Sequence, residues 1–284
     1  MPTARQSLQD LLREMIADVS AKGYVSEAQM EGWTDRIRAA TEAALGRPAE
    51  AREETRDRLR LLFDRFLTRG VFRRVDGINR FDVSMLAPTL RAELDRRVFA
   101  AADLIVVDRD EAVRRTVNRV RGWISSVPPG GTDVLSKVDL RAKLSKGVAD
   151  HKYHKRFVDT DQGHKLIANV AELVAVGSGA IGGVWHDHGE HDKSYDARKE
   201  HLVRSGEFFL IRGSWADEQG LISHRGPIRF YDEVDPVGMK PNCRCWLRYV
   251  TSPRRLPPEA LTSKGRAFVA AGADALARMR NQNA

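Results

Sequence analysis

The sequence predicts an α+β protein, in which an N-terminal helical region is followed by a small mixed α+β domain and a C-terminal amphipathic helix. Three observations lead to this fold class. Apolar residues recur at three- and four-residue steps through residues 1–126, which is the helical period. Short strand-like runs alternate with helical stretches in residues 133–250. Residues 251–284 form a basic tail with helical periodicity after a proline-rich start.

The length and composition bound the class of protein. With 284 residues, 42% of them hydrophobic and 30% charged, the chain can bury one large core or two ordinary ones. Every apolar run is shorter than the roughly 18–20 residues that cross a bilayer. The first residues lack the apolar region of a secretory signal, and two closely spaced cysteines make no disulfide framework. We therefore expect synthesis in a reducing cytoplasm and no membrane partner.

Positive charge is concentrated towards the end of the chain. The formal net charge is +8 and the pI is about 9.7, a balance that favours nucleic acid or another acidic surface as a partner. The tail holds six basic side chains against two acidic ones. The basic ones are Arg254, Arg255, Lys264, Arg266, Arg278 and Arg280. They are candidates for contact with DNA or an acidic protein surface, and the alternative is a solvated helical face.

The helical region shows clear starts and stops. Gly23, Gly46 and Pro48 interrupt the apolar stripes, and Ser26 begins a capping box that ends at Gln29. The predicted helices span residues 7–20, 26–44, 49–68, 86–107 and 110–124, the last two being one helix or two. Cofactor motifs are absent from this region of the sequence. The pattern is typical of paired helices that pack on a partner, so the expected role is structural.

Residues 125–132 contain two prolines and two glycines and predict a linker, where we place the domain boundary. Beyond it, helices are predicted at 139–149, 160–176, 195–203 and 262–280. Strands are predicted at 183–185, 207–211, 228–231 and 244–250.

Four groups of chemically distinctive residues follow one another along the second part of the sequence. They are Asp161 and Gln162 at an expected helix start, Trp185 in a strand, the Asp196, Arg198 and His201 pattern, and Pro241, Asn242, Cys243, Arg244 and Cys245. This order resembles the Mu F-like phage head morphogenesis family, the minor head proteins of tailed bacteriophages, over about residues 137–250. Two features depart from that family's pattern. Residues 186–195 form a histidine-rich and acidic insertion, and Thr160 stands where an arginine is common.

The only two cysteines raise the question of a metal. Alternate residues of a strand face the same way, so both thiols could share one ion. Zinc prefers four tetrahedral nitrogen, sulfur or oxygen ligands. The candidate ligands are Cys243, Cys245, His201 and one of Asp196, His186 or His188. The other interpretation is a small core in which the thiols pack as hydrophobes and Asp196, Arg198 and His201 form a polar network.

Binding, rather than catalysis, is the expected mode of action. A cysteine and His201 could form a nucleophile and base, but the sequence marks neither an oxyanion hole nor a phosphate-binding glycine loop. The resemblance implies a virion protein of the head or neck that associates with the portal protein or the major capsid protein during assembly and accompanies the packaged DNA. Two alternatives stay open: a packaged effector or toxin-like enzyme on the same module, and a DNA-binding protein.

Overall fold

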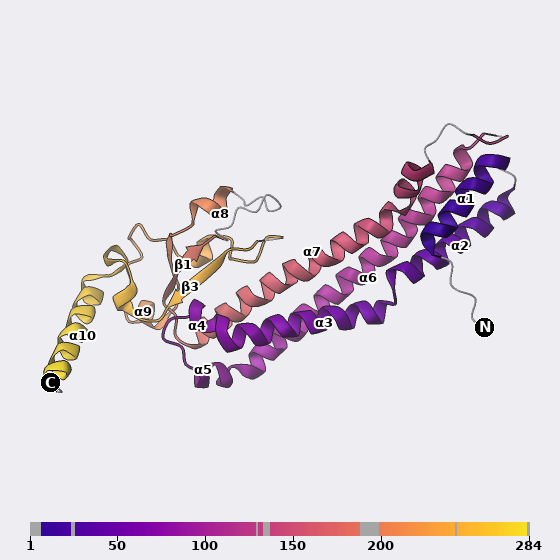
Figure 1. The fold of residues 1–284 in the computed structure, drawn as a ribbon. Helices are drawn as coiled ribbons and strands as arrows, with labels where there is room; N and C mark the ends of the chain where they lie inside the picture. The colour runs from indigo at the N-terminus through magenta and orange to yellow at the C-terminus, as the bar shows by residue number, and fades with distance from the viewer. Residues whose placement is uncertain are drawn as a thin grey trace. The chain divides into compact units, whose positions relative to one another are not determined.

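The computed structural model describes residues 7–23, 26–128, 130–132, 137–187, 199–241 and 243–282 (Figure 1). The chain is mostly helical with one small antiparallel sheet, which confirms the α+β class. It divides into two compact units, each built from two segments of the chain. The first contains Met1–Arg58 and Val98–Asp159, and the second contains Leu59–Arg97 and Thr160–Ala284. The predicted linker at 125–132 lies inside the first unit.

The first unit is helical. It contains α1 (Leu8–Lys22), α2 (Glu27–Leu45) and parts of three longer helices, α3 (Pro48–Arg65), α6 (Ala87–Ser126) and α7 (Lys137–Gly177). Its apolar core consists of Leu8, Leu11, Leu12, Met15, Ile16, Val19, Ile37, Val120, Trp123, Ile124, Val127, Leu140, Leu144 and Val148. The stripe predicted in residues 7–20 is therefore the face that α1 buries.

Serine caps begin the first two helices. The Ser7 hydroxyl accepts a hydrogen bond from the Asp10 N–H, and the Ser26 hydroxyl accepts one from the Gln29 N–H at 3.3 Å. Each bond satisfies one of the N–H groups that a helix start leaves without a carbonyl partner. Gly23 and Gly46 follow α1 and α2 with φ of 74° and 72°, a left-handed conformation that favours glycine.

One predicted interruption does not occur, and the choice left open between one helix and two at 86–124 is decided in favour of one. The helices expected at 86–107 and 110–124 are the single helix α6, and those expected at 139–149 and 160–176 belong to α7. Polar residues break the apolar pattern there, but they find partners within the first unit. Asp108 lies 2.7 Å from His151 Nδ1 and 3.0 Å from His154 Nδ1. The Thr55 hydroxyl donates to the buried Asp159 carboxylate at 3.0 Å.

The second unit contains the sheet. Its strands are β1 (Gly182–His186), β2 (Phe208–Leu210) and β3 (Trp246–Val250), all antiparallel neighbours in the order β2-β1-β3. Gly182 pairs with both Leu210 and Val250. A Cβ at Gly182 would lie 2.5 Å from the Phe208 ring, so this strand position requires glycine.

The second unit also contains residues 59–65 of α3, 87–97 of α6 and 160–177 of α7, and its other elements are short, apart from the last helix. They are the π-helical turn η1 (Phe66–Gly70), α4 (Val71–Arg74), α5 (Arg80–Met85), α8 (Lys199–Val203), α9 (Trp215–Glu218), the 3-10 turns η2 (Tyr231–Glu233), η3 (Pro253–Arg255) and η4 (Pro258–Ala260), and α10 (Ser263–Gln282). Buried side chains join the sheet to the segments that follow it. They are Ile181, Leu210, Ala216, Leu221, Ile222, Phe230, Val250, Leu256, Ala260 and Leu261.

The prediction of a strand at 228–231 is wrong. Only Phe230 makes a single bridge, to Leu210, before the chain turns into η2. Arg212 pairs with Asp232 and Glu233, both at 2.8 Å, and these contacts favour the turn over continued pairing with β2.

A segment from before residue 98 belongs to this unit and lies beside β3. Val75 bridges Tyr249, and the Asp76 N–H donates to the Tyr249 carbonyl at 3.0 Å. The Asp76 carboxylate pairs with Arg248 at 3.2 Å and with Arg255. Figure 1 shows α4, which ends just before this segment, next to the sheet. Residues 59–97 therefore help to position the sheet.

Truncating a core side chain of the first unit should be costly. Leu12 is fully buried, so Leu12→Ala should lower the free energy of unfolding by about 2–5 kcal/mol through lost burial and a cavity. Leu104→Ala is the control, because Leu104 lies in the same unit with half its surface exposed and should cost well under half as much. Chemical denaturation followed by circular dichroism measures both, and equal losses would contradict the described core.

The half-buried carboxyl of Glu172 should make stability depend on pH. Burial raises the pKa of Glu172 above its ordinary 4.5. The protonated form is favoured in the folded chain, so this contribution is present below pH 4.5 and is lost as pH rises through the folded-state pKa. Glu172→Gln should therefore melt at a higher temperature than the wild type at pH 8 and similarly near pH 4. The exposed Glu259→Gln is the control, and an unchanged difference across pH would refute the effect.

Candidate metal centre

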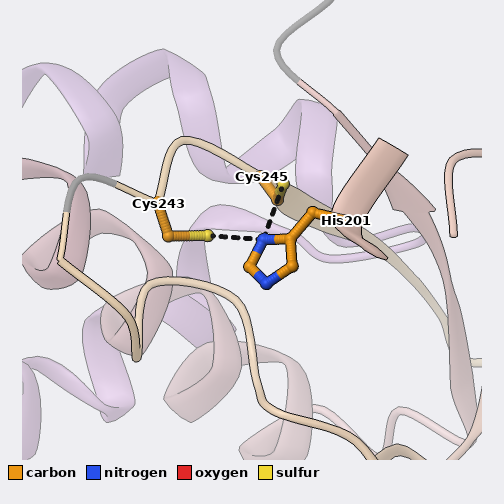
Figure 2. Close-up of side chains that lie close together, drawn as sticks. All are labelled: His201, Cys243 and Cys245. Atoms are coloured by element: carbon orange, nitrogen blue, oxygen red, sulfur yellow. Dashed lines mark hydrogen bonds between the residues drawn. The ribbon is translucent and has the colours of Figure 1, made fainter. Parts of the chain in front are cut away.

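His201 and the two cysteines meet in the second unit (Figure 2). His201 lies on α8, and Cys243 and Cys245 lie directly before β3. Backbone hydrogen bonds place α8 near the sheet: the Gly206 N–H donates to the Trp185 carbonyl at 2.8 Å, and the Trp185 N–H donates to the Glu207 carbonyl at 2.8 Å. The connection from α8 to β2 is thereby tied to β1.

One ring nitrogen faces both sulfurs. The Nδ1 atom of His201 lies 3.5 Å from Cys243 Sγ and 3.6 Å from Cys245 Sγ, as the dashed lines in Figure 2 show. The three atoms lie within 4.8 Å of one another. The exposed fractions of His201, Cys243 and Cys245 are 2%, 2% and 8%. Bulk water therefore hardly reaches these three side chains.

Aromatic and charged side chains surround the histidine. The fully buried Trp185 ring meets the His201 ring edge-on, with centroids 5.5 Å apart and an interplanar angle of 81°. On the other edge, Glu200 Oε1 lies 3.8 Å from His201 Nε2. Glu200 also pairs with Lys240 at 2.5 Å, and Lys240 pairs with Asp235 at 2.6 Å. At 3.8 Å the carboxylate is too far away for a hydrogen bond, and Nε2 is a buried nitrogen without a hydrogen-bond partner among the described residues.

The two thiols have unequal acidities. The pKa of Cys243 is lowered, chiefly because the Cys245 thiol donates a hydrogen bond to its sulfur, and also because the Gly238 and Cys245 N–H groups donate to it; burial opposes the shift. The pKa of Cys245 is raised for the same reason, since it keeps the shared proton, and burial adds to the effect. The pair therefore favours one thiolate and one thiol.

The arrangement suits metal ligation better than nucleophilic catalysis. Thiolate and imidazole are the usual ligands of zinc, and a structural site is closed to solvent. A catalytic cysteine instead lies in a partly exposed, electropositive environment. The 2% exposure of Cys243 leaves no access for a substrate in the described structure.

Several residues expected at the site cannot be placed with it. Asp196, Arg198, His188 and Asn242 lie outside the described residues. His186, an alternative fourth ligand, stacks on Trp246 with ring centroids 4.2 Å apart and an interplanar angle of 15°.

The expected helix start at Asp161 and Gln162 is wrong, because α7 begins at Lys137 and passes through both residues. Asp161 pairs with Lys165 at 2.8 Å, and the Gln162 amide donates to Asp161 at 3.3 Å. Both side chains are buried within the helix packing of the second unit. They belong to that packing, and the cluster of His201 with the thiols does not include them.

Three basic side chains of the tail have partners within the chain. Arg255 pairs with Asp76, Lys264 donates to the Gln219 carbonyl at 2.6 Å, and Arg266 donates to the Leu261 carbonyl at 2.7 Å. Arg254 is exposed on η3. The side chains of Arg278 and Arg280 are outside the described part of α10. These contacts tie the tail to its own unit.

Sequence reasoning missed the residues that support the cluster. Gly238, Glu200 and Lys240 carry no motif, and Asp76 lies 172 residues from Arg248. The one available signal was Gly238, a glycine shortly before the cysteines. Its φ of 78° requires the left-handed conformation, in which its N–H reaches the Cys243 sulfur.

Comparison with protein-family models, with curated proteins and with solved structures finds no match. Among the described residues, none of the helices has the length and apolar character needed to span a membrane.

Removing Trp185 should open the cluster. Trp185→Ala deletes a fully buried ring that touches His201, so the thiols should react with iodoacetamide at least about tenfold faster than in the wild type, and stability should fall by about 3–5 kcal/mol. The control is Trp33→Ala, which removes a tryptophan of the first unit and should leave alkylation of the thiols unchanged. Mass spectrometry of the alkylated chain gives both rates. Equal acceleration in both variants would mean that Trp185 does not seal the site.

Proposed function

We propose that this chain is a minor head protein of a tailed bacteriophage, of the Mu F-like type, which acts by binding and not by turnover. One observation supports the proposal most. Trp185, His201, Cys243 and Cys245, which carry much of the family resemblance, are separated by up to 60 residues and meet in one buried cluster. A motif whose parts share one core is what a family-specific fold signature requires.

The first unit offers a surface for the portal or capsid partner. Large apolar side chains stand exposed on its two long helices: Phe99 and Val107 on α6 and Tyr153 on α7 are each about two-thirds exposed or more. A soluble protein exposes such residues in number mainly where it binds another surface. Aromatic side chains are also the usual anchors of protein interfaces. Docking through this unit would leave the sheet-containing unit as the rigid module.

DNA contact remains a secondary part of the proposal. The tail is basic, but Arg255, Lys264 and Arg266 have partners within the chain. Lys264 and Arg266 donate to neutral carbonyls and keep their charge, so any contact of the tail with packaged DNA would weaken steeply with salt. The exposed Arg254 is the described residue best suited to it.

Cosedimentation tests the proposal. The full chain, mixed with portal rings or proheads from the same phage genome, should sediment with them at physiological salt. Phe99→Ser combined with Val107→Ser should weaken this binding at least about tenfold, because it removes two exposed apolar anchors. Val203→Ser is the matched control, since it removes an exposed apolar side chain from α8 in the other unit.

The other outcomes separate the alternatives. Absence of the wild-type chain from both portal and prohead fractions would overturn the proposal. Salt-sensitive binding of the isolated chain to duplex DNA, without such cosedimentation, would favour the DNA-binding protein. A measurable toxic or enzymatic activity that His201→Ala abolishes while cosedimentation persists would favour the packaged effector.

A further inference from the structure

We propose that His201, Cys243 and Cys245 bind one zinc ion, which fastens α8 to the start of β3. The inference goes beyond the proposed function and does not rest on it. Its basis is the position of three ligand atoms that come from two places far apart in the sequence.

The distances match a tetrahedral zinc site. With zinc–sulfur bonds of about 2.3 Å and zinc–nitrogen bonds of about 2.0–2.1 Å, a sulfur and a nitrogen ligand of a tetrahedral site lie about 3.6 Å apart. The two observed distances, from His201 Nδ1 to Cys243 Sγ and to Cys245 Sγ, are 3.5 and 3.6 Å. The described residues thus supply three of the four ligands that zinc prefers; both nitrogen–sulfur distances match the tetrahedral value, and the two sulfurs lie within 4.8 Å of each other.

Hydrogen bonding alone accounts less well for this geometry. A ring nitrogen has either one N–H or one lone pair, so it makes one well-directed hydrogen bond in the ring plane. Here Nδ1 is nearly equidistant from two sulfurs. A single cation bound by all three atoms satisfies each of them, whereas a proton on Nδ1 can point at only one of the two sulfurs. Burial makes this difference important, because an unsatisfied polar atom costs about 1–3 kcal/mol when water cannot reach it.

The surroundings are those of a structural metal site. Glu200 Oε1 lies 3.8 Å from Nε2, on the side of the ring away from the sulfurs. The two atoms are too far apart for a hydrogen bond, but the negative charge of Glu200 favours a proton on Nε2 and leaves Nδ1 free to ligate. The N–H groups of Gly238 and Cys245 are directed at the Cys243 sulfur, as donors are at metal-bound thiolates. Trp185 covers the ring.

The ion would add a second link to the Glu200–Lys240 ion pair, which already connects α8 to the segment before Cys243. Between His201 and Cys243 the regular elements are only β2, α9 and η2, of three or four residues each. Coordination at both ends would restrict this segment in the folded chain and couple metal binding to folding.

Metal analysis tests the proposal. The full chain, produced in zinc-supplemented medium without a polyhistidine tag, should carry about one equivalent of zinc by plasma mass spectrometry. Cys243→Ser, Cys245→Ser and His201→Ala should each reduce the zinc content about tenfold or more. His224→Ala is the control, because His224 is an exposed histidine of the same unit that pairs with Asp217, and its zinc content should equal that of the wild type.

A second measurement uses only the wild-type chain, so variants that fail to fold do not decide the test. Replacing zinc by cobalt should produce a thiolate-to-cobalt charge-transfer band and the intense visible bands of a tetrahedral ion. Thiol modification with a mercurial should then release the metal. Zinc below about a tenth of an equivalent, even after dialysis against zinc, would overturn the proposal. So would a cobalt spectrum without thiolate bands, or full zinc retention in a folded Cys243→Ser, Cys245→Ser double variant.

Discussion

The contact between His201 Nδ1 and the two cysteine sulfurs is the constraint on which the second unit depends. The strands of its sheet have five, three and five residues, so backbone pairing alone holds little of the chain. Residues 204–245 contain few regular elements, and buried side chains such as Leu221, Ile222 and Phe230 pack the middle of the segment into the core of the unit, while its two ends are held separately. One end is α8, tied to β1 through the Trp185 backbone, and the other enters β3. Because the ring and both sulfurs are buried together, moving either end would leave polar atoms without partners.

In the first unit, too, polar side chains find partners that lie far away in the sequence. Its long helices carry polar residues at turns where the apolar stripe lapses, and those residues are satisfied across the helix packing. Asp108 contacts His151 and His154, and Asp159 accepts a hydrogen bond from Thr55. Buried or half-buried carboxylates with such partners stabilise continuous helices where local propensity alone would allow a break. The helices can then keep large apolar side chains on their exposed faces, which are free for a partner.

These differences explain what the sequence could predict. The stripe in α1, the serine cap of α2 and the strands at Trp185 and Leu247 follow from local periodicity and turn chemistry, so they were predictable from neighbouring residues. The continuity of α7 was not predicted and that of α6 was left open, because it depends on partners 43 to 104 residues away. The same holds for the pairing of Asp76 with Arg248 and for the turn that replaces the strand at 228–231. For the site, residue types and order predicted His201 with both cysteines as a candidate set. They could not show that Nδ1 faces the sulfurs or that Gly238 donates to one of them.

Metal ligation and nucleophilic catalysis compete for the same atoms. A zinc ion bound by both thiolates and by Nδ1 uses the sulfur lone pairs that a nucleophile needs and the nitrogen lone pair that a general base needs. The cluster therefore cannot serve a structural zinc and a cysteine–histidine catalytic pair at the same time. Burial separates the two possibilities, because a ligand set gains from exclusion of water whereas a nucleophile must meet its substrate. At 2% exposure for both His201 and Cys243, with Trp185 over the ring, the geometry favours ligation. A zinc-bound module of this kind would suit the proposed binding role, since a preorganised surface loses less conformational entropy when it meets its partner.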